Sequence, residues 1–126
     1  MNEWFNLGKV FEKIKSFGLN AVRIPVPIQA ILPIDQKYNN EDDYMVQCYQ
    51  DAMPQLQTVY LVASRLRIGV YLSVHTTKQN ETATDIDNYL KGIENVVKTF
   101  KSHDSFIGID VLNEPRLSDQ LCKEYW

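Results

Sequence analysis

The sequence predicts an α/β fold organised around a parallel sheet, and two observations support this prediction. Helix-like and strand-like segments alternate along the chain, in the order helix, strand, helix, strand, helix, strand. The three strand-like segments are short apolar runs rich in β-branched residues, which is typical of strands buried in parallel sheets. Right-handed crossovers between them would make the three strands parallel neighbours.

The first helix is expected at residues 4–17, where apolar residues recur every three or four positions and charged residues occupy the other side. Gly18 follows at the place where a left-handed residue commonly ends a helix. The apolar run at residues 20–26 is then the first strand. It ends at Pro25 and Pro27, because proline lacks the N–H group that would continue a ladder of hydrogen bonds.

Residues 28–51 are the least regular part of the chain. Their proline and asparagine residues and the acidic group at residues 41–43 predict a long loop, with a short helical turn at about residues 44–49. Long excursions of this kind are often lids or binding loops, and a plain surface loop fits the pattern equally well.

The second helix is expected at residues 52–66, with Asp51 as its N-terminal cap and Pro54 in its first turn, where proline is tolerated. The second strand, residues 70–75, follows and runs into a polar segment at residues 76–84. The helix and the strand together repeat the unit that the first part of the chain began.

The third helix, residues 86–100, has the cleanest helical periodicity in the chain, and Asp85 is expected to cap it. It leads to the last strand at residues 106–114, an apolar run that stops at an Asn-Glu-Pro tripeptide. Pro115 ends this strand and holds Glu114 extended at its tip. A carboxylate at the carboxyl end of a parallel strand lies where α/β barrels keep their catalytic groups.

The composition is that of one soluble globular unit, with 126 residues, 44% hydrophobic and 23% charged, so residues 1–126 are expected to form one domain or part of one. A net charge of -3 without a basic cluster argues against a nucleic-acid surface. No apolar stretch approaches the roughly 20 residues of a membrane span, and the first residues lack the pattern of a signal peptide. As written, the chain would stay in the cytoplasm.

Cys48 and Cys122 match no metal-binding spacing and are expected to be free thiols.

Strand residues alternate between the two faces of a sheet, so the register of each strand can be compared with its chemistry. One face is uniformly aliphatic: Val22, Ile24, Val26, Val70, Leu72, Val74, Ile107, Ile109 and Val111. The other face gathers the polar residues of the three strands: Arg23, Ser73, His75, Asp110 and Glu114. A sheet covered by helices on both sides would be apolar on both faces. A polar face therefore fits the interior of an α/β barrel that opens on an active site.

Some of these polar residues also have plainer explanations. Arg23 and Asp110 could form a buried ion pair with no part in chemistry, and the sequence favours neither this nor a role in a site. His103, near the end of the third helix, is expected to interact with the helix dipole rather than to act in catalysis. His75 ends a strand beside the strand of Glu114, which favours a role in the site.

Three segments carry a resemblance to a known family: residues 11–26 (FEKIKSFGLNAVRIPV), the strand that ends in His75, and residues 108–115 (GIDVLNEP). In this order and at these spacings they resemble glycoside hydrolase family five, the cellulase and exo-β-1,3-glucanase family of (β/α)8 barrels. The fungal-type glucan β-1,3-glucosidases look most similar. The resemblance implies a partial (β/α)8 TIM barrel that covers about the second to fourth strands with their helices. It further implies a retaining glycosidase acting on β-glucans or their oligosaccharides, an extracellular or cell-wall location, and no metal or organic cofactor.

By this resemblance Glu114 is the general acid/base and Asn113 binds the sugar 2-hydroxyl. Arg23 steers the nucleophile carboxylate, and His75 lines the subsite where cleavage occurs. These roles agree with the chemistry, because a retaining glycosidase needs one carboxylic acid that protonates the leaving oxygen and then deprotonates the incoming water. An asparagine beside it can donate a hydrogen bond that strengthens as positive charge develops on the sugar.

The sequence departs from the family pattern in three respects. The loop at residues 76–81, which is often Gly-rich in these relatives, reads Thr-Thr-Lys-Gln-Asn-Glu. The strand that usually ends in Asp-Leu-His reads Ser-Val-His at residues 73–75, so an inner carboxylate is missing. The family nucleophile, a glutamate on the seventh strand, has no counterpart, and Asp110, Glu81 and Glu124 are not convincing substitutes. We therefore expect the chain alone to be inactive. Its open sheet edges predict that it is marginally stable, aggregates, or pairs with another copy or with a missing fragment.

Two other functions are compatible with the sequence. A non-catalytic sugar-binding or pseudoenzyme fragment would use Trp126, the tyrosines and polar loop groups to bind oligosaccharides. A small nucleotide-binding α/β domain is disfavoured, because neither a Gly-x-Gly-x-x-Gly motif nor a P-loop follows any strand.

Overall fold

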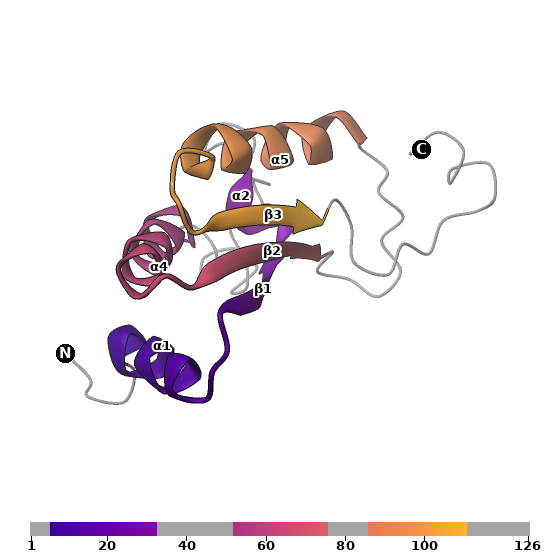
Figure 1. Cartoon of the computed structure of the whole chain (residues 1–126). Helices are drawn as coiled ribbons and strands as arrows, with labels where there is room; N and C mark the ends of the chain where they lie inside the picture. Colours follow the sequence, from indigo (N-terminus) through magenta and orange to yellow (C-terminus); the bar gives the residue numbers. More distant parts are fainter. Residues whose placement is uncertain (1–5, 33–51, 76–85, 111–126) are drawn as a thin grey trace.

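A computed structural model of the chain describes residues 6–32, 52–75 and 86–110 (Figure 1). These ranges contain, in chain order, α1 (Leu7–Ser16), β1 (Ala21–Pro27), α2 (Ile28–Ile31), α4 (Ala52–Leu66), β2 (Gly69–His75), α5 (Ile86–Phe100) and β3 (Phe106–Asp110). The three strands form one sheet in the order β1-β2-β3, and both neighbouring pairs are parallel. The predicted α/β fold is thus confirmed. Within the described residues, no helix has the length and apolarity that crossing a membrane requires.

The ends of α1 follow from two residues beside it. Within the described residues the helix begins at Leu7, because the side-chain oxygen of Asn6 accepts a hydrogen bond from the Lys9 N–H at 3.1 Å and caps the first turn; the predicted start at residue 4 lies outside them. Gly18 has a φ of 78°, so the predicted left-handed residue after the helix is confirmed. The predicted caps of the later helices, Asp51 and Asp85, lie outside the described residues.

The segment predicted to be irregular, residues 28–51, begins with one helical turn, α2. This prediction is therefore wrong for residues 28–31, of which Ile28, Ala30 and Ile31 are buried. The turn packs against α5 and α4, and the Asn95 side chain donates a hydrogen bond to the carbonyl of Ile31 at 3.0 Å. Contacts from distant helices therefore stabilise α2. The turn predicted at residues 44–49 lies outside the described residues.

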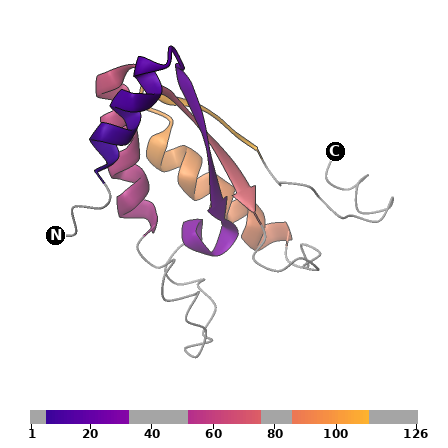
Figure 2. The same cartoon turned by 90° about the horizontal axis from the view of Figure 1, so that it is seen from below.

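The hydrophobic core lies between the sheet and the helices, and α1, α4 and α5 lie on the same side of the strands (Figure 2). Val70, Leu72 and Val74 of β2 are fully buried in this core. Across it, the ring of Tyr60 on α4 stacks on Phe100 of α5 with centroids 4.6 Å apart. The predicted aliphatic face of β2 is thus the face that the helices cover.

The structure corrects the predicted face of one residue in β3. The sequence analysis placed Ile107 with Ile109 on the aliphatic face, but Ile107 is 55% exposed, whereas Phe106 and Ile109 pack against the core. The cause is a shift of register, because Val70 pairs with Phe106 and the next residue of β2 skips Ile107. Ile107 is the extra residue of a bulge, and a bulge changes the alternation of faces along its strand.

Candidate active site

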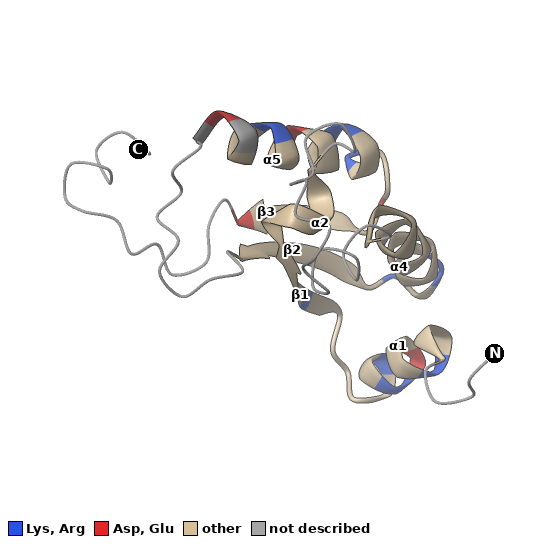
Figure 3. Cartoon of the chain, turned by 180° about the vertical axis from the view of Figure 1, so that it is seen from behind, with Lys and Arg blue, Asp and Glu red and all other residues tan. Residues whose placement is uncertain are grey.

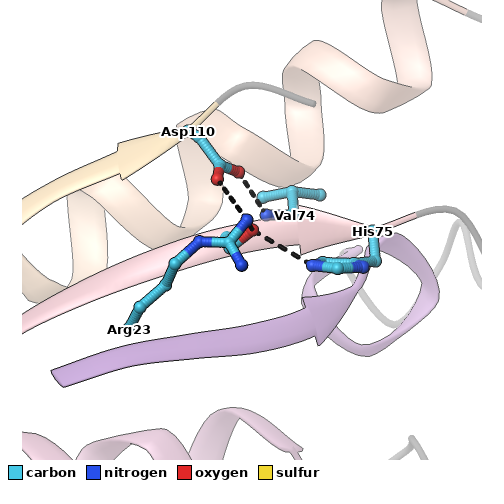
Figure 4. Close-up of polar contacts among 5 residues, drawn as sticks. Arg23, Val74, His75 and Asp110 are labelled. Atoms are coloured by element: carbon cyan, nitrogen blue, oxygen red, sulfur yellow. Dashed lines mark hydrogen bonds and ion pairs between the residues drawn. The ribbon is translucent and has the colours of Figure 1, made fainter. Parts of the chain in front are cut away.

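The face of the sheet opposite the core carries a cluster of polar side chains at the carboxyl ends of the strands (Figure 4). We call this the polar cluster, and its members come from all three strands: Arg23, Ser73, His75 and Asp110. The register places Ser73 beside Pro25 of β1 on one side and beside Asp110 of β3 on the other. Apart from one basic residue on β1 and one acidic residue at the tip of β3, the strands carry no Lys, Arg, Asp or Glu (Figure 3).

Arg23 and Asp110 form the ion pair that the sequence analysis considered, but the pair is not buried. Nη2 of Arg23 lies 3.2 Å from Oδ2 of Asp110, and the side chains are 52% and 24% exposed. The second carboxylate oxygen of Asp110, Oδ1, accepts a hydrogen bond from the Val74 N–H at 2.7 Å. The carboxylate is therefore fixed by the backbone of β2 as well as by Arg23.

The side chain of Ser73 contacts one residue of β1 and one residue of its own strand, β2. Its side chain is fully buried. Arg23 Nη2 donates a hydrogen bond to its Oγ, and Nε2 of His75 lies 3.1 Å from the same oxygen. Because Oγ is buried and already bonded, it does not have the access that a nucleophilic serine needs.

The whole chain, residues 1–126, matches the protein family Cellulase (glycosyl hydrolase family 5). The chain belongs to glycosyl hydrolase family 5. No curated protein matches the chain in sequence.

Solved structures of family 5 enzymes share the fold of this chain. Endoglucanase Cel5A of Pseudomonas stutzeri is similar with a TM-score of 0.66 and 20% identity over 86% of this chain and 33% of that chain. The complex of a Pyrococcus horikoshii endocellulase with cellotetraose is similar with a TM-score of 0.62 and 26% identity, over 90% of this chain and 33% of that chain. The chain therefore spans about a third of their length, and its sheet is part of the family 5 TIM barrel.

Two of the four predicted site residues lie within the described part of this family 5 chain. Arg23 and His75 are brought together, because both contact Oγ of Ser73. Asn113 and Glu114 lie outside the described residues, and they follow the last described residue of β3, Asp110, by three and four positions.

The sequence analysis placed Ser73 on the polar face but gave it no role of its own. The departure from the family's Asp-Leu-His pattern was the available signal, since it placed a small polar residue on the same face of its strand as His75. Neither the full burial of Ser73 nor its contact with Arg23 can be deduced from that pattern, because both depend on neighbouring strands.

His103 lies outside the polar cluster. It stands between α5 and β3, near the amino ends of the strands, and its Nε2 lies 3.1 Å from Nε2 of Gln57. Its ring packs against those of Tyr60 and Phe100, with centroids 5.6 and 6.1 Å away. These contacts indicate a packing role for the ring of His103, and the predicted interaction with the helix dipole stays a prediction.

An open cavity of about 480 Å³ lies at the opposite, amino-terminal edge of the sheet, near Asn20, Arg67 and Asp104. Ligands of parallel α/β folds bind at the carboxyl ends of the strands, so the polar cluster is the stronger candidate for the site. Among the described residues, no group of three or more His, Cys, Asp or Glu side chains could hold a metal ion.

Proposed function

We propose that the protein containing this chain hydrolyses β-glucosidic bonds in β-glucans with retention of configuration. The observation that carries the proposal is the polar cluster at the carboxyl ends of adjacent parallel strands, one of which leads within four residues to Glu114. Family 5 membership supports the class of reaction. In this proposal residues 1–126 are an incomplete barrel domain that supplies the acid/base half of the site.

We assign Glu114 as the general acid/base, which protonates the leaving oxygen and then deprotonates the attacking water. Asn113 beside it binds the sugar 2-hydroxyl. Arg23 and His75 bind and orient the groups that react, and their shared contact with Ser73 supports their placement in one site. No metal or organic cofactor takes part in this scheme.

The preferred linkage is β-1,4 in this proposal, because the similar solved structures are endocellulases and one contains cellotetraose. The likeness of the sequence motifs to fungal-type glucan β-1,3-glucosidases makes the β-1,3 linkage the second candidate. Comparing kcat/KM of the complete protein on cellotetraose and on laminaritetraose decides between the two linkages. A β-1,4 specificity requires a higher kcat/KM on cellotetraose, and a β-1,3 specificity requires a higher kcat/KM on laminaritetraose.

Retention needs two carboxylates about 5–5.5 Å apart, and this chain lacks a convincing second one. Asp110 is not suited to the role of nucleophile, because its Oδ1 accepts a hydrogen bond from the Val74 N–H, which holds the carboxylate against the backbone of β2. We therefore propose that the chain alone does not hydrolyse glucans. The alternative for the chain itself is a non-catalytic sugar-binding fragment, which would bind oligosaccharides without turnover.

The test of the acid/base assignment is Glu114→Gln in a complete barrel that contains this chain. We expect kcat on cellotetraose to fall by a factor of at least about 10²–10⁴, the usual contribution of general acid–base catalysis. An aryl glucoside with a leaving group that needs no protonation should lose much less activity. Measuring both substrates distinguishes the loss of the proton donor from misfolding, because a misfolded enzyme would lose activity on both.

The matched control is Glu124→Gln, which removes a glutamate of the same chain to which the proposal gives no role. This variant should keep its activity on both substrates. Wild-type activity of Glu114→Gln on cellotetraose would refute the assignment, whatever the control does.

We also propose that the chain associates with itself through the edge of β3. Among the described strands, β1 and β3 are each paired on one side only. The Asn20 carbonyl accepts a hydrogen bond from the Gly69 N–H at 2.8 Å, so the backbone N–H and C=O groups of every second residue from Asn20 onward point towards β2. The backbone groups of Pro25 and Pro27 therefore point away from β2, towards the open edge. Because proline has no N–H, it blunts the edge of β1 and leaves β3 as the better pairing edge. Size-exclusion chromatography with light scattering should give a mass that rises with concentration, and a monomer at every concentration would contradict the proposal.

A further inference from the structure

Ser73 occupies the centre of the polar cluster, and its hydroxyl has two neighbours there. Arg23 can only donate hydrogen bonds, so Oγ of Ser73 is the acceptor in that contact. The single proton of the hydroxyl then needs an acceptor, because the side chain is fully buried. Among the described residues, Nε2 of His75 at 3.1 Å is the acceptor within hydrogen-bond reach.

We infer that Ser73 is a positioning residue that donates its proton to Nε2 of His75 and thereby holds His75 in the tautomer protonated at Nδ1. In the other tautomer, Nε2–H would point at Oγ, and the proton of the buried hydroxyl would lose its acceptor. An unsatisfied buried donor is costly, so the hydrogen-bond network selects the first tautomer. Arg23 contributes indirectly, because its own hydrogen bond forces the serine proton towards the histidine.

The consequence for the site rests on the proposed function. His75 is half-buried at the end of β2, and the ring nitrogen that does not face Ser73 lies on the far side of the ring from that contact (Figure 4). With Ser73 bonded to Nε2, His75 presents an N–H donor there. Together with the guanidinium of Arg23, it makes this part of the site rich in donors, which suits the acceptor oxygens of a sugar ring and its hydroxyl groups.

Two-dimensional multiple-bond ¹H–¹⁵N NMR of the ¹⁵N-labelled chain, at a pH where imidazole is neutral, reads the tautomer directly from the two ring nitrogens. We expect Nδ1 of His75 to be the protonated nitrogen in the wild type. In Ser73→Ala the Nδ1–H signal pattern should be lost in favour of Nε2–H, and Ser73→Thr, which keeps the hydroxyl, should restore it. His103, which has no described contact with Ser73, should be unchanged in all three proteins and reports that they are folded.

A wild-type His75 protonated at Nε2 would overturn the inference, even if Ser73→Ala failed to fold. An unchanged tautomer in a folded Ser73→Ala would overturn it as well. Adding cellotetraose to a complete barrel that contains this chain tests the proposed function separately. Absence of any shift of the His75 signals would count against the sugar site, and it would leave the tautomer result intact.

Discussion

Asp110 links the end of β3 to β2 and to Arg23, and two substitutions separate these interactions. Asp110→Ala removes both, and it leaves the N–H of the fully buried Val74 without its 2.7 Å acceptor. An unsatisfied buried donor costs about 1–3 kcal/mol. Asp110→Asn can keep the oxygen that Val74 uses and loses only the charge.

The ion pair should contribute little to stability. The Arg23 and Asp110 side chains are 52% and 24% exposed, and exposed pairs of this kind are worth about 0–1 kcal/mol. We therefore expect Asp110→Asn to lower the free energy of unfolding by at most about 1 kcal/mol. Asp110→Ala should lower it by about 2–3 kcal/mol, of which the backbone hydrogen bond accounts for the larger part.

Urea unfolding of the three proteins measures the difference. With an m-value of about 1–3 kcal/mol/M, a loss of 2 kcal/mol shifts the midpoint by about 1 M. In 1 M NaCl the ion pair is screened, so Asp110→Asn should approach the wild type while Asp110→Ala remains less stable. The exposed Asp104→Ala is the control and should stay within about 0.5 kcal/mol of the wild type. Equal losses for Asp110→Asn and Asp110→Ala would refute the reasoning, since the charge would then matter more than the hydrogen bond.

Two further substitutions test local features of the fold, again by urea unfolding. The hydroxyl of Tyr60 is buried without a hydrogen-bond partner among the described residues, so Tyr60→Phe should leave stability unchanged or raise it by up to about 1 kcal/mol. Because burial raises the pKa of Tyr60 above its usual 10.0, the wild type should lose stability as the pH rises above that value, and Tyr60→Phe should lose less. Arg67 follows α4 with a φ of 54°, so Arg67→Gly should stabilise the chain by about 0.5–1 kcal/mol, whereas Arg65→Gly within α4 should cost about 1 kcal/mol. A lower midpoint for Arg67→Gly than for Arg65→Gly would contradict the strain argument.

The helices were the most predictable part of the fold, because their signal is local. The predicted ranges 52–66 and 86–100 agree with α4 and α5 at both ends, since each has an apolar stripe that the sequence displays directly. The turn α2 was missed for the opposite reason. It is four residues long, without a side-chain cap on its first turn, and its contacts come from α5 and α4.

The bulge in β3 shows the limit of reading faces from alternation. Each residue from 106 to 110 is compatible with a regular strand, and only the pairing with β2 shows that Ile107 is skipped. The next residue, Gly108, is the sequence feature that corresponds to this bulge. A Cβ on Gly108 would lie 2.8 Å from Cε2 of Tyr71, so the tyrosine ring packs where any larger residue would have a side chain. A glycine inside a strand was therefore the available signal for an irregularity.

The residues of the polar face could be predicted from strand alternation, but the hydrogen bonds between them could not. These hydrogen bonds give a physical reason why a serine stands at position 73, where the family usually has an aspartate. Ser73 and Asp110 are register partners on neighbouring strands, so a carboxylate at position 73 would stand directly beside that of Asp110. Like charges in this arrangement repel each other and would share the one guanidinium of Arg23. A neutral hydroxyl avoids this repulsion, still accepts from Arg23 and has a proton left for His75. The serine is therefore consistent with a polar cluster in which Asp110 supplies the carboxylate that pairs with Arg23 within the described part of the chain.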